Sequence, residues 1–480
     1  MQMQDKPQIK QKKRILSVFS LVMINVIAVD SIRTLPMAAT YGLSLVTLYL
    51  LGAILFLVPT ALITAELSTT WPMQGGMYYW VKTAFGPRWG YLTVYLQWIY
   101  NIVWYPTILT LIAGTLVYLI KPTWIDNPYY MVGAVLSVFW LCTLLNLFGM
   151  RISSLVSTLG SLFGTLGPMF LIIGLSLWWI LSGKPSQIAF SLAGLKLNLP
   201  SIHSWVFSTA IIYSLLGLEM ASVHATEVKT PAKDYPKALL ISVIIIFFSL
   251  TLASLAIALV VPKNELDIVA GIIQAFSLFF EAFNLAWMKP VIVFFLVLGG
   301  IGAVATWIIG PTKGLFAAAK DGLMPKVLQK TNRFGVPKNM LLLQGLIGSL
   351  MTSFYVLLPS VKSAYWALSA LAAQLSMLMY VLLFLSVIVL RYKQPNVTRP
   401  FQIPGGKIGL WCVSLAGLAV ACSIVFLGFV PPAGIDVGNI WLYEGTLVGG
   451  IAILLFPVIQ WKKQAVRVAT ASALNLAENS

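Results

Sequence analysis

Long apolar runs separated by short polar segments occupy almost the whole chain. Each run has roughly 20 residues or more, which is enough for a helix to cross about 30 Å of hydrocarbon. This pattern predicts an all-α polytopic membrane protein. The twelve predicted transmembrane helices lie at residues 15–41, 43–68, 90–120, 129–148, 153–181, 204–226, 236–261, 287–318, 339–358, 363–390, 407–430 and 440–461.

Basic residues gather in alternate connecting segments. With the N-terminus in the cytoplasm, the inward segments hold 23 Lys and Arg residues and the outward segments hold 6; Arg33 and Lys313, inside spans, complete the total of 31. An excess of Lys and Arg marks the cytoplasmic face of a membrane protein. We therefore expect both termini in the cytoplasm, as tails of residues 1–14 and 462–480 on either side of a membrane domain at 15–461.

Composition excludes several classes of function. Charged residues make up 9% of the chain and the mean hydropathy is +0.90, whereas soluble domains are about 25% charged. The net charge of +17 lies in short clusters between apolar runs, so it indicates topology and not nucleic-acid binding. The three cysteines lie within apolar runs without a CxxC or Cys/His cluster, and there are two histidines. We expect no disulfide, no metal, no cofactor and no enzymatic activity.

One outward segment, residues 261–284, differs from the other connections because its apolar residues recur near helical spacing. They are Ile268, Ile272, Ala275, Phe276, Phe279 and Phe283. The spacing predicts a short helix at the outer surface. Such a helix either forms a lid or packs against the bundle, and we favour packing.

Two acidic residues lie inside predicted spans. Asp30 is midway along the first span, near Pro36, and Glu219 is midway along the sixth, beside Gly217. A charge at the bilayer centre costs at least about 2.5 to 3.5 kcal/mol, so such residues face a cavity or a partner. Pro36 and Gly217 are interpreted as helix breakers, which predicts an interruption in each span.

Two interrupted spans that lie five spans apart indicate an inverted repeat of two five-helix units. Repeat one covers residues 15–181, repeat two covers 204–390, and two peripheral helices occupy 407–461. Backbone N–H and C=O groups freed at a break must line a wet cavity or bind a solute. The N-terminal end of a half-helix favours a carboxylate and free carbonyls favour an ammonium group, and a zwitterionic amino acid offers both.

Six motifs, in order along nearly the whole chain, resemble the amino acid/polyamine/organocation transporter superfamily, and in particular its glutamate/GABA antiporter family. They are "AELSTTWPMQGGMYYWVKTAFGPRWG" (65–90), "GLEMASVHATEVKTPAKDYPKALL" (217–240), "VPKNELDIVAGIIQAF" (261–276), "TWIIGPTKGLFAAAKDGLMPK" (306–326), "FGVPKN" (334–339) and "IPGGK" (403–407). The resemblance implies a leucine-transporter-type fold, with ten helices in two inverted repeats and two peripheral helices. It also implies a bacterial inner-membrane protein, monomeric or homodimeric.

The same resemblance assigns roles by position. The first break would bind the substrate carboxylate, the second its amino group, and aromatic residues would close the site. This set comprises Val29, Asp30, Ser31, Ile32, Arg33, Tyr213, Ser214, Gly217 and Trp307. Glu219 matches a buried glutamate on the path to the cytoplasm and would couple protons, with His224 as a second candidate for proton coupling or gating.

Asp30 and Arg33 depart from the glycine-rich break that is common in the superfamily. Because they are three residues apart, they would neutralise one another on an intact helix. Alternatively, Asp30 orients Arg33 toward a carboxylate, whose geometry matches a guanidinium group. The short C-terminal tail also differs from the longer extension of acid-resistance exchangers, so we do not assign it a gating role.

We expect an amino acid antiporter that exchanges an amino acid, with glutamate or glutamine as candidates, for a related amino compound such as GABA. Protons are a possible further partner. The alternative is a proton-coupled amino acid symporter with the same fold. A membrane enzyme would need clustered acid and base residues, which the two mid-span acids do not provide.

Overall fold

The computed structural model describes residues 17–456, apart from 74, 149–155, 157, 161, 221, 223–227 and 320–323, and also residue 458. The predicted tails and His224 lie outside this part. Within it, ten of the predicted spans form helices long and apolar enough to cross a membrane. Seven contain one long helix: α6 (Pro87–Ile120), α7 (Pro128–Leu147), α12 (Pro231–Val260), α14 (Lys289–Ala318), α15 (Lys338–Thr352), α17 (Val361–Lys393) and α18 (Gly406–Leu427).

The other spans are built from shorter pieces. The first consists of α1 (Val18–Val29), η1 (Ile32–Thr34) and α2 (Leu35–Ala39). The second joins η2 (Gly42–Ser44), α3 (Leu45–Gly52), a π-helical turn η3 (Ala53–Leu57) and α4 (Val58–Thr70). The described part of the fifth contains a π-helical turn η5 (Leu162–Leu166) and α9 (Gly167–Leu181).

Two predicted spans are described only in part. The described part of the last contains a helix of 17 residues, Ile440–Phe456. The sixth begins with α10 (Ile202–Trp205) and α11 (Ser208–Ser214) and then leaves the helical path. This interruption agrees with the break that was predicted around Gly217.

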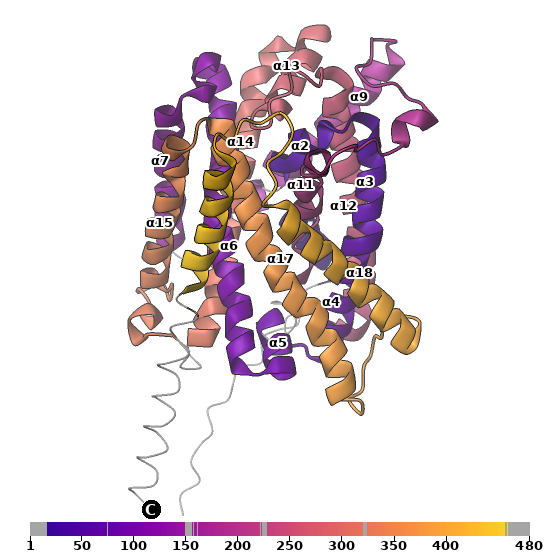
Figure 1. The fold of residues 1–480 in the computed structure, drawn as a ribbon, viewed down its shortest axis with the longest axis vertical. Coiled ribbons are helices and arrows are strands. Elements are labelled where there is room, and N and C mark those ends of the chain that lie inside the picture. The colour runs from indigo at the N-terminus through magenta and orange to yellow at the C-terminus, as the bar shows by residue number, and fades with distance from the viewer. Residues whose placement is uncertain are drawn as a thin grey trace, which may run out of the picture.

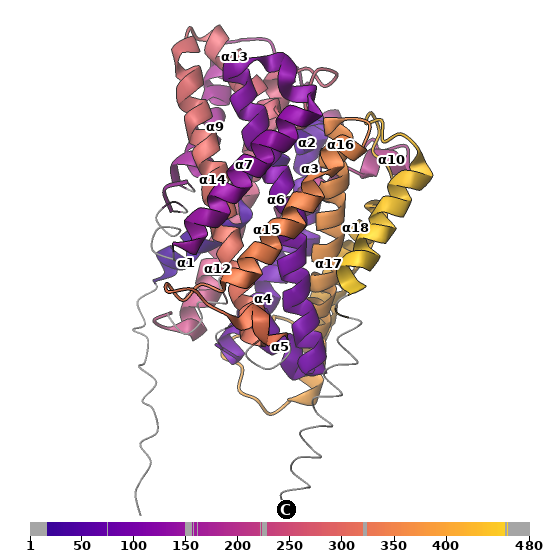
Figure 2. The ribbon, with the colours of Figure 1, turned by 90° about the vertical axis from the view of Figure 1, so that its left-hand side faces the viewer.

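The helices form one bundle in which α6 and α17 lie at the centre and α18 lies at the periphery (Figures 1 and 2). Most of α6 and α17 is buried, which is expected for helices surrounded by others. By contrast, α18 exposes large apolar side chains, including Ile408, Leu415 and Phe426. Lipid is the natural neighbour of that face.

The predicted short helix in the segment 261–284 is α13 (Gly271–Ala282). It lies at the end of the bundle opposite α5 (Met77–Phe85) (Figure 1). Its apolar face is buried, and Phe283 stacks on Trp178 of α9 with ring centroids 3.9 Å apart. Asp267 accepts hydrogen bonds from the N–H groups of Val269 and Ala270 and pairs with Lys362 of α17 at 2.9 Å. The expectation that this helix packs against the bundle is therefore correct.

Candidate functional site

The first span is interrupted at Asp30 and Ser31. Helix α1 ends at Val29, the next two residues have extended backbone with ψ angles of 115° and 121°, and helical structure resumes at Ile32. Pro36 lies in the first turn of α2, where proline fits because no N–H is needed there. The break predicted at Val29 to Arg33 was correct, but Pro36 does not break the first span, since it lies in the second half-helix after the interruption.

The second interruption follows α11. Gly217 has a φ angle of +120°, a conformation essentially restricted to glycine. Its N–H donates a hydrogen bond to the Tyr380 hydroxyl at 3.0 Å. A Cβ atom on Gly217 would lie 3.1 Å from the carbonyl oxygen of Ala28 on α1. The two interrupted segments, almost 190 residues apart in sequence, are therefore in contact.

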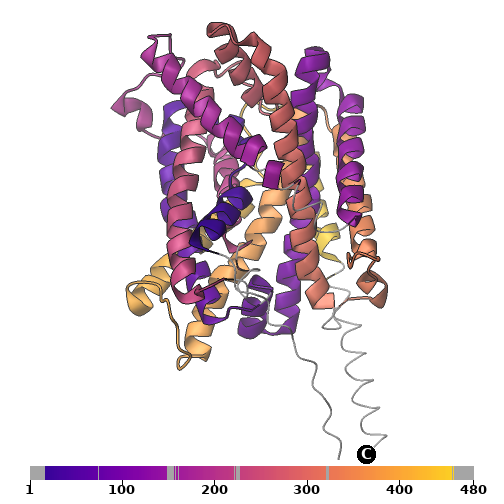
Figure 3. The ribbon, with the colours of Figure 1, turned by 180° about the vertical axis from the view of Figure 1, so that it is seen from behind.

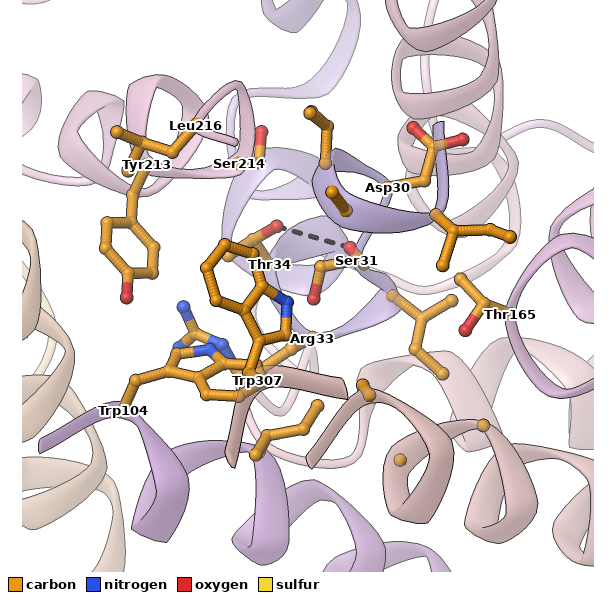
Figure 4. A pocket seen from close by; sticks show the side chains of 18 of the residues that line it. Asp30, Ser31, Arg33, Thr34, Trp104, Thr165, Tyr213, Ser214, Leu216 and Trp307 are labelled. Carbon is orange, nitrogen blue, oxygen red and sulfur yellow. Dashed lines mark hydrogen bonds between the residues drawn. The ribbon is translucent and has the colours of Figure 1, made fainter. Parts of the chain in front are cut away.

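A cavity of about 60 Å³ lies at the two breaks (Figure 4). One water molecule needs a cavity volume of roughly 10 to 15 Å³. The cavity therefore has room for several waters or for part of a small solute. Eight of the nine residues predicted to bind substrate line it: Val29, Asp30, Ser31, Ile32, Arg33, Tyr213, Ser214 and Trp307. The ninth, Gly217, shapes the break but is absent from the lining.

Arg33 is a buried cation on the cavity wall, with 1% of its surface exposed. It donates a hydrogen bond to the Ser369 hydroxyl of α17 at 2.9 Å, and its guanidinium lies 5.2 Å from the ring centre of Tyr213. Within the described part of the chain no carboxylate pairs with it, and its Nε has no hydrogen-bond partner. A buried cation without an anion is costly, so the site favours a bound anion.

Asp30 points away from Arg33 (Figure 4). Its two carboxyl oxygens lie 3.1 and 2.9 Å from the Ser249 hydroxyl of α12. Neither expectation for the pair is met, because Asp30 neither neutralises Arg33 nor orients it. The physical reason is the break itself: with extended backbone at residues 30 and 31, the i, i+3 geometry of a helix is lost and the two side chains diverge.

Two tryptophans form another wall of the cavity. The ring centres of Trp104 and Trp307 are 6.2 Å apart, and the Trp307 carbonyl accepts a hydrogen bond from Tyr105 at 2.9 Å. Trp307 was predicted, whereas Trp104 was missed. A signal for it existed, because Asn101, Trp104 and Ile108 recur at helical spacing along α6 and all three line the cavity.

The two amides of α6 have different roles. Asn101 lines the cavity, and its Nδ2 donates to the Gln97 carbonyl at 2.7 Å. Gln97 lies one turn away, and its side chain donates to the sulfur of Met220 at 3.1 Å. Sequence alone did not decide whether these amides contact another segment or the cavity. In the structure Asn101 lines the cavity and Gln97 contacts Met220.

Glu219 lies close to the second break and outside the cavity lining, with 2% of its surface exposed. The Tyr380 hydroxyl of α17 donates a hydrogen bond to its Oε2. Within the described part of the chain, its Oε1 has no hydrogen-bond partner. This carboxyl group therefore touches the same tyrosine that receives the N–H of Gly217, which links Glu219 to the break.

Comparison with known proteins gives consistent matches over nearly the whole chain. A family model described as amino acid permease matches residues 15–453. An uncharacterized transporter of Legionella pneumophila is 45% identical over 449 residues, covering 94% of this chain and 96% of the relative. A glutamate/gamma-aminobutyrate antiporter of Lactococcus lactis is 28% identical over 94% of this chain and 91% of the relative. A probable agmatine/putrescine antiporter of Lactococcus lactis is 25% identical over 97% of this chain and 98% of the relative.

Proposed function

The chain belongs to the amino acid permease family, and we propose that it is an antiporter for amino acids that have a carboxylate group. Glutamate and glutamine are the candidate substrates, and GABA is the candidate counter-substrate. The observation behind this proposal is the buried Arg33 guanidinium on the cavity wall, which has no carboxylate partner among the described residues. Transport takes place in a bacterial inner membrane with both termini in the cytoplasm.

Arg33 favours one substrate class over another. A guanidinium group binds a carboxylate through two parallel hydrogen bonds. Glutamate, glutamine and GABA all have a carboxylate, whereas agmatine and putrescine have none and are cations. A buried arginine repels such cations, so the relationship to the agmatine/putrescine antiporter does not extend to its substrates.

The remaining polar groups of the cavity suit the amino end of the substrate. The C-terminal ends of α1 and α11 meet at the breaks, and helix C-termini have partial negative charge that favours an ammonium group. Tyr213, Trp104 and Trp307 supply aromatic faces, which attract cations. The carboxylate then lies on Arg33 and the ammonium group near the free carbonyls of the breaks.

Two groups of contacts near the breaks are suited to act as alternating gates. In the first group Arg33 is bound to Ser369 of α17, and the Tyr365 hydroxyl donates to the Arg33 carbonyl at 3.2 Å. In the second group Gln97 of α6 donates to the sulfur of Met220. In this proposal the substrate carboxylate displaces Arg33 from Ser369, which opens or closes the first gate. Glu219 takes up a proton when the break at Gly217 moves.

Counter-transport in proteoliposomes tests the proposed activity. Vesicles that contain GABA, glutamate or no amino acid are given labelled glutamate outside, with and without a proton gradient. An antiporter accumulates label when counter-substrate is inside and not in empty vesicles. Uptake into empty vesicles that depends on the proton gradient would instead identify the alternative, a proton-coupled symporter.

The role of Arg33 is tested in the same assay. Arg33→Gln removes the cation, and we expect glutamate uptake to fall by at least tenfold. Arg33→Lys keeps a positive charge, and its uptake should lie between that of Arg33→Gln and that of the natural protein. Lys121→Gln is the matched control, since Lys121 is an exposed cation outside the cavity. If Arg33→Gln transported glutamate as well as the control, Arg33 would not bind the carboxylate.

A further inference from the structure

The Thr165 side chain is a polar group of the cavity wall that the proposed function does not use. Thr165 lies in the π-helical turn η5, lines the cavity and is 8% exposed. Its hydroxyl makes no hydrogen bond to another residue in the described part of the chain. By contrast, Thr34 and Ser214 on the same wall donate their hydroxyl hydrogens to backbone carbonyls. The Thr165 hydroxyl is therefore free to bind a solute.

The packing of η5 against α14 brings Thr165 to the cavity. A Cβ atom on Gly164 would lie 2.1 Å from the backbone nitrogen of Gly299, so no side chain separates the two segments there. Gly299 itself lines the cavity. A π-helical turn holds one residue more than an α-helical turn, and such turns are frequent at functional sites. The residue after Gly164 is thus placed on the cavity wall.

Thr165 and the Arg33 guanidinium lie on opposite sides of the cavity (Figure 4). The guanidinium is near Tyr213 and is bound to Ser369 of α17. Thr165 lies on the side of Asp30 (Figure 4). A solute that reaches both sides meets a cation at one end and a free hydroxyl at the other.

The surroundings of Thr165 favour a positively charged group. Helix α1 contacts η5, and its last three residues, 27–29, line the cavity. The last carbonyls of a helix have no partners within it and have partial negative charge. Asp30 adds an acidic side chain, and no ion pair to it occurs in the described chain. Because a hydroxyl oxygen has two lone pairs that accept hydrogen bonds, Thr165 suits an ammonium group.

We propose that Thr165 determines substrate specificity by accepting a hydrogen bond from the substrate ammonium group. In the proposed function, on which this inference rests, Arg33 binds the carboxylate. The substrate then lies along the cavity, with its carboxylate on Arg33 and its ammonium group between Thr165 and the carbonyls of α1. This arrangement selects compounds whose two charged groups are separated by a carbon chain, namely GABA, and glutamate bound through its side-chain carboxylate. It disfavours glutamine, because the only carboxylate of glutamine is next to its ammonium group.

Binding to the purified protein in lipid nanodiscs tests the role of Thr165 with two compounds that differ by one group. GABA has an ammonium group, and butyrate is the same chain without it. Isothermal titration calorimetry measures the Kd of GABA, and competition against GABA measures that of butyrate. We expect Thr165→Val to weaken GABA binding roughly tenfold or more, as for a lost hydrogen bond to a charged group, and to leave butyrate binding within about twofold. Thr165→Ser keeps the hydroxyl and should retain the affinity for GABA.

Thr115→Val is the matched control. Thr115 is a buried threonine of α6 whose hydroxyl has no partner in the described chain, and it is absent from the cavity lining, so its substitution should change neither affinity. The inference is overturned if Thr165→Val changes both affinities equally or changes neither. It is also overturned if the affinity for GABA depends on sodium in the natural protein but not in Thr165→Val, since a sodium ion would then be the cation at Thr165.

The same preparation separates these failures from a failure of the proposed function. If the natural protein exchanges glutamate for GABA while Thr165→Val binds both compounds unchanged, only the role of Thr165 is lost. If the natural protein binds neither GABA nor glutamate, the proposed function fails as well.

Discussion

Gly217 lies against Ala28, and this contact joins the two interrupted spans. A Cβ atom at Gly217 would be 3.1 Å from the Ala28 carbonyl oxygen, and the φ angle of Gly217 is +120°. The freed N–H of Gly217 is bound by Tyr380. Each break therefore helps to shape the other, because a side chain at position 217 would crowd Ala28 and would have a strained backbone.

Gly217→Ala tests this relationship. The strained backbone alone is expected to cost about 1 to 3 kcal/mol, so the apparent melting temperature in detergent should fall and transport should be lost or strongly reduced. Gly133→Ala is the control, because nothing lies within 4 Å of its Cβ position on α7. That substitution should be neutral or slightly stabilising. Equal melting temperatures for both variants would contradict the account of the break.

A pair of glycines, Gly164 and Gly299, sets the contact between the fifth and eighth spans. Figure 3 shows α9 crossing toward α14. At this crossing a Cβ on Gly164 would lie 2.1 Å from the backbone nitrogen of Gly299, which lines the cavity. Gly164→Ala forces the helices apart and should cost about 1 to 3 kcal/mol, measured by thermal unfolding. Gly174→Ala on α9 is the control, because a Cβ atom there has open space and should not destabilise the protein. An equal loss of stability in Gly174→Ala would show that the helix crossing does not cause the loss in Gly164→Ala.

Glu66 holds a cluster of cations at the end of α4. Arg391 binds both of its carboxyl oxygens, at 2.6 and 2.5 Å, and the N–H of Ile403 donates to it at 2.9 Å. Arg399 lies 3.5 Å away. Removing one partner of a buried pair costs roughly 3 to 5 kcal/mol, so Glu66→Gln should lower the melting temperature sharply.

The half-exposed pair of Lys362 and Asp267 provides the comparison for Glu66. Exposed ion pairs contribute about 0 to 1 kcal/mol, so Lys362→Gln should have a small effect. High salt should reduce the difference between Lys362→Gln and the natural protein further. A larger loss for Lys362→Gln than for Glu66→Gln would refute this ranking.

Glu219 is predicted to couple protons through its contact with Tyr380. Glu219→Gln keeps the hydrogen bond from the Tyr380 hydroxyl but cannot titrate, so the dependence of exchange on pH should flatten while folding is retained. Tyr380→Phe keeps the carboxyl group and should displace the pH profile without flattening it. An unchanged profile in Glu219→Gln would remove this residue from proton coupling.

Much of the fold was predictable because lipid imposes a length and a composition on every span. The twelve runs, the break at Gly217 and the packed helix α13 follow from local sequence. The position of the first break, at Val29 to Arg33, came from the family resemblance, and the observed interruption at Asp30 and Ser31 lies within it, whereas Pro36 alone pointed to a later residue. Asp30 and Ser31 are polar positions within an apolar run, which marks the region of the break but not the residue at which α1 ends.

The residues of the cavity were predicted only where the local sequence marks them. Residues at the breaks stand out as polar positions within apolar runs. Trp104 lies three residues after Asn101, which places both on the same face of α6. By contrast, Ser369 and Ser249 are ordinary residues of long apolar helices. Their contacts with Arg33 and Asp30 join positions 336 and 219 residues away, and no sequence pattern indicates which serine lies opposite which charge.

The most direct measurement is a structure of the protein with glutamate bound. We predict that a substrate carboxylate lies within hydrogen-bond distance of the Arg33 guanidinium, between Tyr213 and the pair of Trp104 and Trp307, and that Arg33 has left Ser369. Glutamate bound elsewhere, with Arg33 still on Ser369 and the two breaks empty, would contradict the account.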